Sequence, residues 1–237
     1  MRVYEVQPGC ANLDGLCRAE RPDPQPGPHE VLIRIRATSL NYRDHMIVSG
    51  HYFTPVSRPT IPLSDGAGEV AAVGPGVTRF QKGDRVAGAF FQVWFDGPPS
   101  RRHPALGLPL DGTLAEYIVL HEDGVVAIPA NLSFEEAATL PCAGVTAWNA
   151  LMVSGNPVKP GDTVLCLGTG GVSMLGMQFA VAAGARGRCL PHPGRSRSRR
   201  VAARSGRGRA TRRRCGRLHS TPARLSPRPA TPAPGGR

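Results

Sequence analysis

The residues with the clearest chemical meaning lie in the segment 168–173, which reads GTGGVS. An apolar, strand-like run over residues 163–167 precedes this segment, and an apolar, helix-like run over residues 172–183 follows it. A strand, a glycine-rich turn and a helix in this order are typical of sites that hold the pyrophosphate of a dinucleotide. The sequence therefore predicts a nucleotide-binding turn at this point, although a tight turn without a ligand is the alternative.

Each part of this turn has a separate physical task. Gly168 permits the tight exit from the strand, Gly170 and Gly171 let the backbone approach phosphate oxygens closely, and the helix start at Val172 supplies amides and a positive dipole end. With Thr169 between the glycines, these five residues are the candidate cofactor contacts. The residue that selects NAD or NADP would follow a second strand, so we predict an NAD(P) cofactor without choosing between them.

The six cysteines, at positions 10, 17, 142, 166, 189 and 215, form no Cys-x-x-Cys pair, and no secretory segment follows Met1. This pattern favours free thiols in a cytoplasmic setting. No apolar run approaches the ~20 residues that a membrane span needs. His45 and His51 stand six residues apart in a loop-like stretch, where an exposed pair is favoured over a metal site.

The positive charge is concentrated at one end of the chain. Residues 186–237 hold 16 Arg and no Lys, Asp or Glu, whereas residues 1–185 hold 13 basic and 17 acidic residues. The segment 186–237 also lacks Phe, Trp, Tyr and Ile. Such a segment cannot bury enough apolar surface to offset its ordering entropy, so we predict that it is a disordered basic tail.

The elements that must position these residues begin with short strands. Apolar and charged residues alternate over residues 31–37, as in a half-buried strand. Further strands are expected over residues 2–6, 68–73, 84–90, 116–120 and 125–128, with residues 121–124 as a hairpin loop. Short strands separated by Gly and Pro predict a compact barrel or sandwich.

The pattern changes after residue 131. Ser133 and Glu136 form a capping box for a short helix that Pro141 interrupts, and residues 146–152 are apolar enough for another helix. Gly184 is placed to end the helix over residues 172–183. A parallel sheet needs a second strand next, but residues 186–193 (RGRCLPHP) show no apolar run. We therefore predict a nucleotide-binding unit that stops after its first strand and helix.

Taken together, seven motifs resemble the medium-chain dehydrogenase/reductase superfamily of alcohol dehydrogenases and quinone reductases. In order along the chain they are SLNYRD (39–44), LSDGAG (63–68), VGPGV (73–77), GDRV (83–86), GTLAEY (112–117), LPCAGVTAW (140–148) and the glycine turn. The resemblance implies an α+β to α/β chain: a GroES-like β-barrel catalytic domain over residues 1–130, then the start of a Rossmann domain over residues 131–185. Residues 186–237 would be the tail.

The same resemblance indicates whether the chain has the residues to bind a catalytic zinc ion. Zinc-using members place Cys, His and Cys at positions that match Asn41, Ser64 and Cys142 here, and Asp65 adds only another oxygen. One thiolate with two oxygens is a poor zinc site. The sequence is therefore similar to the zinc-independent branch, and no metal is expected.

That branch lines its cleft at positions that match Asn41, Tyr42 and Asp44. The resemblance implies that Asn41 and Tyr42 orient or protonate the substrate oxygen, while Asn41 and Asp44 as caps of a turn or helix are the alternative. Thr146 matches a nicotinamide contact, with a helix-start threonine as the alternative. Cys142 is expected to be a packing residue rather than a nucleophile.

The resemblance implies hydride transfer between NAD(P)H and a carbonyl, alcohol or enone, with a small-molecule partner. We expect this chain to be inactive, and the homodimer of intact relatives is not expected to form. A non-catalytic interaction module is one alternative. Nucleic-acid binding through the tail is another, which the lack of aromatic residues and Lys disfavours. A frameshift near residue 185 would also explain the Arg-rich composition, and the other two reading frames test it.

Overall fold

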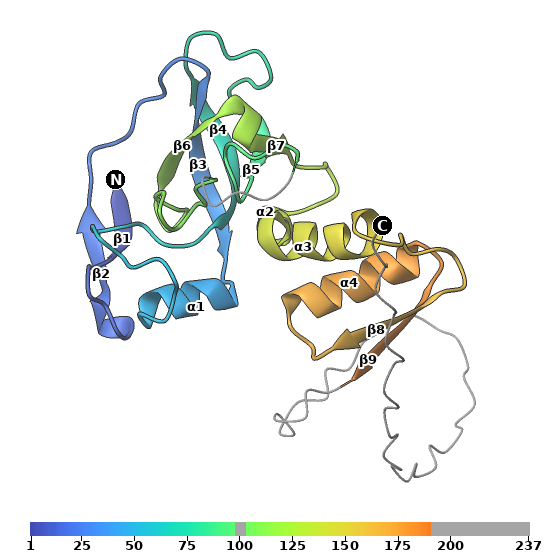
Figure 1. Cartoon of the computed structure of the whole chain (residues 1–237). Coiled ribbons are helices and arrows are strands. Elements are labelled where there is room, and N and C mark those ends of the chain that lie inside the picture. Colours follow the sequence, from blue (N-terminus) through green and yellow to red (C-terminus); the bar gives the residue numbers. More distant parts are fainter. Residues whose placement is uncertain (98–102, 191–237) are drawn as a thin grey trace, which may run out of the picture. The chain divides into compact units, whose positions relative to one another are not determined.

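The structure is a computed structural model and describes residues 1–97 and 103–190. Five antiparallel strands form the main sheet (Figure 1), in the order β6 (Tyr117–His121), β3 (Glu30–Ser39), β4 (Asp65–Val73), β5 (Arg85–Gly88) and β7 (Val125–Ala127). A separate antiparallel pair consists of β1 (Arg2–Val6) and β2 (Leu16–Glu20), joined through a 3-10 turn at Leu13–Gly15. The pattern over residues 2–6 predicted β1, whereas β2 was not expected from the sequence.

The sheet curls into a partly closed barrel. Strands β6 and β7 lie at opposite ends of the strand order, yet only the 3-10 turn Glu122–Gly124 separates them along the chain. The two edges must therefore approach each other, and the barrel expectation is confirmed over the sandwich. The expected hairpin at residues 121–124 is wrong, because β6 pairs with β3 whereas β7 pairs with β5.

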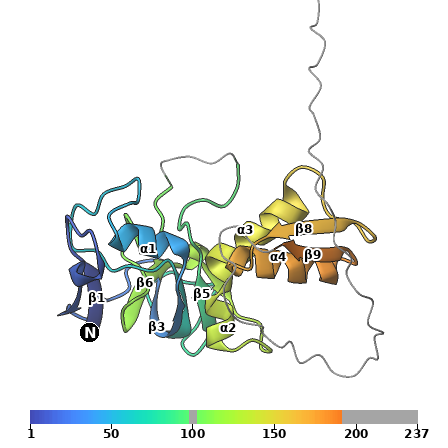
Figure 2. The same ribbon diagram turned by 90° about the horizontal axis from the view of Figure 1, so that it is seen from below.

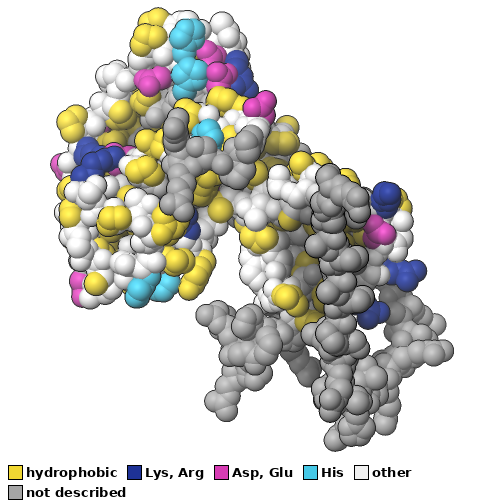
Figure 3. All heavy atoms as spheres, in the orientation of Figure 1, with side chains coloured by type: hydrophobic (Ala, Val, Ile, Leu, Met, Phe, Trp, Pro, Cys, Tyr) yellow, Lys and Arg dark blue, Asp and Glu magenta, His cyan; other side chains and the backbone are white. Residues whose placement is uncertain are grey.

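Alternation along β3 directs its apolar side chains inward. Arg34, which follows Ile33, is exposed, whereas Val31 and Ile33 are buried. They join the larger apolar cluster, which comprises Val31, Ile33, Val70, Val86, Leu106, Ile118, Leu120 and Val125. Burial of each such side chain stabilises the folded state by ~1.5–3 kcal/mol. Acidic and basic side chains are interspersed among other residues on the face that Figure 3 shows.

One helix connects two barrel strands, and the others follow the last strand of the barrel. Helix α1 (Tyr42–Val48) follows β3 directly, so the loop expected around His45 is a helix. Helix α2 (Phe134–Ala138) begins at the predicted capping box: Ser133 Oγ accepts from the Glu136 amide at 3.1 Å and Glu136 Oε2 accepts from the Ser133 amide at 2.8 Å. A π-helical turn (Leu140–Gly144), α3 (Val145–Trp148) and a second π-helical turn (Asn149–Val153) continue from there.

The last described elements form a β-α-β unit. Strand β8 (Thr163–Leu167) and helix α4 (Gly171–Ala182) are close to their expected positions, and Gly184 has the predicted positive φ of 81°. Strand β9 (Arg186–Leu190) then pairs in parallel with β8, with Leu167 opposite Leu190. Helix α4 packs against both strands (Figure 2).

Strand β9 corrects two expectations. The nucleotide-binding unit does not stop after one strand, and residues 186–190 are not part of a disordered tail. Backbone pairing needs no apolar side chains, so the sequence RGRCL can extend along β8 although it lacks an apolar run. The prediction for residues 191–237 lies outside the described residues. Within the described part of the chain, no helix has the length and apolarity to span a bilayer.

Candidate active site

Two buried carboxyl groups lie where β3 and β4 meet α1. Asp44, in the first turn of α1, is 2% exposed, and its Oδ2 accepts a hydrogen bond of 2.8 Å from the Asn41 amide. Its Oδ1 has no partner among the described residues. Burial, with a smaller contribution from nearby Asp65, raises the pKa of Asp44 to about 6. Asp44 can therefore gain or lose a proton near neutral pH.

Asp65, the first residue of β4, is fully buried and connects the barrel to the helical segment. Its Oδ1 accepts from Ser64 Oγ at 2.7 Å, and its Oδ2 accepts from the Cys142 amide at 3.1 Å. Burial raises the pKa of Asp65, although the hydrogen bonds from Ser64 Oγ and the Cys142 amide oppose the rise. The sequence suggests for Asp65 only the role of a weak zinc ligand, because no local signal places it beside Cys142, 77 residues away.

The fold brings two of the three candidate catalytic residues, Asn41 and Asp44, into contact and leaves the third, Tyr42, exposed. Asn41 is the residue before α1 and caps it together with Asp44, so the capping alternative is confirmed for both. The Asn41 Nδ2 is buried and has no hydrogen-bond acceptor among the described residues. Tyr42 is 76% exposed, with its ring 6.0 Å from that of His45. Catalytic roles for the three remain predictions.

Arg43 lies between the buried carboxyl groups and the aromatic ring of Phe90. Its guanidinium donates to the carbonyl oxygens of Leu106 and Leu108 at 2.9 and 2.6 Å, and its Cζ lies 5.0 Å from the Phe90 ring centre. A fixed positive charge here partly offsets the cost of burying Asp44 and Asp65. No local sequence pattern indicates this position of Arg43, because its partners come from distant loops.

Cys142 lies in the first π-helical turn. Burial, and then the negative charge of Asp65, raise the pKa of its thiol to about 11, so the thiol remains protonated at neutral pH. A protonated thiol is a weak nucleophile and a weak metal ligand. Among residues 1–97 and 103–190, no three His, Cys, Asp or Glu side chains are arranged to hold a metal ion. The absence of zinc remains a prediction.

A cavity of about 820 Å³ adjoins Cys142, between the barrel and the helical segment. Its walls come from the end of β5 and the following loop, from β7 and from the helical segment. The lining residues are Ala87, Gly88, Ala89, Phe90, Phe91, Trp94, Val126, Ala127, Ile128, Pro129, Leu132, Ala137, Leu140, Pro141, Cys142, Val145, Thr146, Asn149, Ala150 and Ser154. The predicted nicotinamide contact, Thr146, is among them, in α3.

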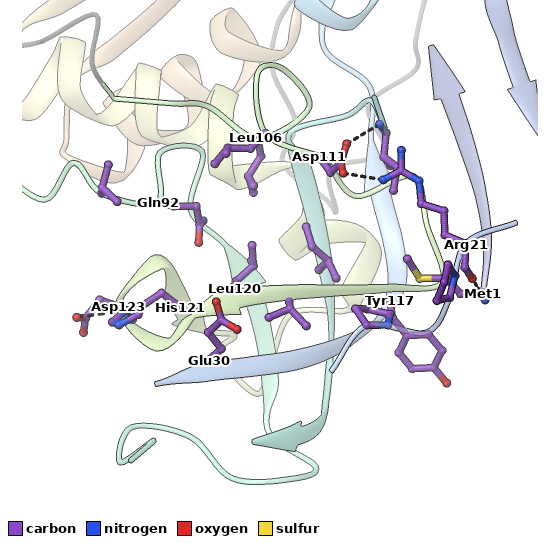
Figure 4. A pocket seen from close by; sticks show the side chains of 18 of the residues that line it. Met1, Arg21, Glu30, Gln92, Leu106, Asp111, Tyr117, Leu120, His121 and Asp123 are labelled. Atoms are coloured by element: carbon purple, nitrogen blue, oxygen red, sulfur yellow. Dashed lines mark hydrogen bonds and ion pairs between the residues drawn. The ribbon is translucent and has the colours of Figure 1, made fainter. Parts of the chain in front are cut away.

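A second cavity, of about 760 Å³, is lined by β6 together with residues from distant loops (Figure 4). Its charged groups already have partners: Arg21 and Arg58 both pair with Asp111, and His121 lies 3.6 Å from Asp123. A charged ligand would have to displace these pairs. We therefore consider the first cavity the better candidate for a substrate site.

The glycine turn has the geometry that a pyrophosphate requires. Gly168 has a φ of 80°, Gly170 caps α4, and a Cβ at either position would meet no atom within 4 Å. At Gly171 a Cβ would lie 3.6 Å from that of Ala143. Thr169, Gly170 and Val172 are exposed. The backbone at the start of this 12-residue helix is therefore open to a phosphate group, and the residues fit the predicted cofactor.

Comparison with known proteins agrees with this arrangement. Residues 27–130 match the family model of the alcohol dehydrogenase GroES-like domain. A zinc-type alcohol dehydrogenase-like protein of Schizosaccharomyces pombe is 50% identical over 186 residues, which cover 77% of this chain and 54% of that protein. A quinone oxidoreductase of Pseudomonas aeruginosa is 38% identical over 161 residues, covering 68% of this chain and 43% of that one.

Solved structures agree as well. The crystal structure of an NAD-dependent alcohol dehydrogenase superimposes with a TM-score of 0.74 at 36% identity, covering 81% of this chain and 58% of that one. A GroES-like barrel followed by a glycine-turn β-α-β unit is the architecture of a two-domain dehydrogenase. The chain belongs to the medium-chain dehydrogenase/reductase superfamily. It spans about half the length of the curated relatives it matches.

Proposed function

We propose that the chain derives from an NAD(P)-dependent oxidoreductase that reduces or oxidises a carbonyl, alcohol or enone without zinc, in the cytoplasm. The glycine turn carries this proposal, because its open backbone at the start of α4 fits a pyrophosphate. The nicotinamide, when bound, supplies or accepts the hydride. Thr146 on the cavity wall would position its ring.

The protein's own residues would hold the substrate oxygen. The Asn41 Nδ2 is a buried donor without an acceptor in the described structure, and a carbonyl oxygen would satisfy it. Asp44, with its pKa near 6, would hold or release a proton behind Asn41. Tyr42 would donate only to an oxygen that reaches the outer side of α1, because its side chain is exposed.

The absence of zinc is proposed from the donor set. The three positions that match the zinc ligands of the family carry an amide, a hydroxyl and a thiol whose pKa is about 11. Zinc prefers thiolates and imidazoles, so these groups would compete poorly for it. Metal analysis of the purified protein should therefore find substoichiometric zinc; one tightly bound zinc per chain would contradict the proposal.

The cofactor site is tested with Gly170→Ala. The added methyl group meets no protein atom, so the fold should be unchanged, but it occupies the space that a pyrophosphate needs. NADH or NADPH binding, measured by calorimetry, should weaken roughly tenfold or more. The matched control is Gly176→Ala in the same helix, where a Cβ makes only ordinary contacts at 3.6–3.9 Å. Equal affinity in the parent and Gly170→Ala would reject the site.

We also propose that this chain alone has little or no turnover. Leu165, Leu167 and Leu190 are 55%, 71% and 51% exposed on one side of β8 and β9, so this parallel sheet has an uncovered face. Parallel sheets are stable when both faces are covered. A steady-state assay with either cofactor on aldehydes and quinones tests this, and robust turnover would contradict it.

A further inference from the structure

The cavity of about 820 Å³ beside Cys142 is lined by uncharged residues. Among its described lining residues there is no Lys, Arg, His, Asp or Glu. A carboxylate, phosphate or ammonium group placed there would lose its hydration without gaining a charged partner, which costs several kcal/mol. The described lining therefore favours an uncharged substrate over a charged one.

One wall of the cavity consists of packed aromatic rings. The rings of Phe90 and Phe91 lie 4.7 Å apart at 74°, and those of Phe91 and Trp94 lie 5.1 Å apart at 67°. These edge-to-face contacts are favourable geometries for aromatic pairs. The guanidinium of Arg43, 5.0 Å from the Phe90 ring centre, and the ring of His103, stacked on Trp94 at 5.4 Å, support the wall from outside the lining.

The opposite wall offers a few polar groups. Thr146 and Asn149 come from α3 and the π-helical turn after it, and Asn149 Oδ1 accepts from Ser154 Oγ at 2.7 Å. A ligand that matches both walls has a large apolar ring system at one end and an uncharged hydrogen-bond acceptor at the other. The volume of about 820 Å³ is within the range of sites that enclose drug-sized ligands.

We propose that this cavity binds a bulky, uncharged aromatic carbonyl compound, such as an aryl ketone, aryl aldehyde or fused-ring quinone. The ring system contacts Phe90, Phe91 and Trp94, and the polar carbonyl end lies away from these rings. Small aliphatic aldehydes leave the aromatic wall uncovered, and acidic or phosphorylated compounds are excluded by desolvation. The assignment as a substrate rests on the proposed function, whereas the binding itself does not.

Equilibrium dialysis of the full chain without cofactor tests the binding. The probes are 2-acetonaphthone, 2-naphthoate, which has the same rings and a charge, and acetone, which has the same carbonyl without rings. We expect 2-acetonaphthone to bind about tenfold or more tightly than either. Phe91→Ala should weaken its binding about tenfold, whereas Phe95→Ala, a matched phenylalanine that lines the other cavity, should leave it unchanged.

The outcomes separate this inference from the proposed function. Equal binding of the ketone and the naphthoate, or an unchanged affinity in a folded Phe91→Ala variant, would overturn the inference. Saturable ketone binding by a chain that binds neither NADH nor NADPH would support the inference and reject the proposed function. Cofactor binding without ketone binding would support the proposed function and overturn the inference. Circular dichroism of each variant confirms that it is folded.

Discussion

At the scale of single residues, the buried pair Asp44 and Asp65 has the clearest consequence for folding. Asp65 satisfies its oxygens with Ser64 Oγ and the Cys142 amide, whereas Asp44 leaves Oδ1 without a partner in the described structure. Burying an ionised carboxylate is unfavourable unless it is fully paired. Asp44 is therefore kept at a cost to stability, as expected for a residue whose proton has a use.

The cost of Asp44 can be measured through pH. Its pKa in the folded chain is raised from the ordinary 3.8 to about 6, so the folded state binds the proton more tightly and loses stability as pH rises through 6. At ~1.4 kcal/mol for each tenfold change in acidity, the full effect is ~3 kcal/mol.

The variant Asp44→Asn removes this dependence. The parent loses stability as pH rises from 4 to 7, but the variant has no carboxyl group at this position to titrate. The difference in free energy of unfolding, variant minus parent, should therefore grow by up to ~3 kcal/mol between pH 4 and pH 7. Urea unfolding over this pH range measures the difference. The carboxyl groups that do not interact with Asp44 are common to both proteins and cancel in the comparison, whereas Asp65, which interacts with Asp44, contributes a smaller difference. A difference that does not change with pH would show that Asp44 has an ordinary pKa.

At the scale of elements, the pairing of β3 with β4 depends on one close backbone approach. A Cβ at Gly68 would lie within 3 Å of the Arg34 carbonyl oxygen and carbon and of the Ile33 side chain. Two register irregularities in β3 flank this region, between Leu32 and Ile33 and between Ile35 and Ala37. Gly68 is therefore required by the sheet and not by a turn.

We expect Gly68→Ala to destabilise the barrel by ~3 kcal/mol or more, because the methyl group meets backbone that cannot move without breaking strand pairs. Thermal unfolding followed by circular dichroism gives the change. Gly170→Ala is the matched control, since its Cβ enters open space and its φ is negative. Similar melting temperatures for the two variants would contradict the assigned strand register.

At the scale of the whole described chain, stability is distributed unevenly. Both buried apolar clusters lie within residues 31–138, and no residue of β8 or β9 is buried. A two-stranded sheet with one uncovered face opens at a low free-energy cost. The cofactor turn therefore belongs to the less stable part of the described structure.

Hydrogen exchange monitored by mass spectrometry tests this distribution. Amides of β8 and β9 should exchange roughly tenfold or more faster than those of β3 and β4, because local opening of the β-α-β unit breaks few apolar contacts. Addition of NADH should slow exchange around Gly168–Val172 if the turn binds it, and should leave β3 unchanged. Equal protection of the two sheets would contradict the uneven distribution.

The sequence by itself determined the features that depend on a few neighbouring residues. Alternation predicted β1 and β3, the pair Ser133 and Glu136 predicted the start of α2, and Gly184 predicted the end of α4. The glycine turn and the superfamily were also readable. Local backbone preferences and side-chain periodicity act within one or two turns of chain, so they leave a direct trace in the sequence.

Only the tertiary structure decided which distant segments meet. It placed β6 and β7 at opposite edges of the sheet, paired the Arg-rich β9 with β8, and brought Asp65 to the Cys142 amide. It also left Tyr42 exposed while burying Asp44. These outcomes depend on contacts between residues tens of positions apart, whose free energies are set by mutual packing and desolvation rather than by any local pattern.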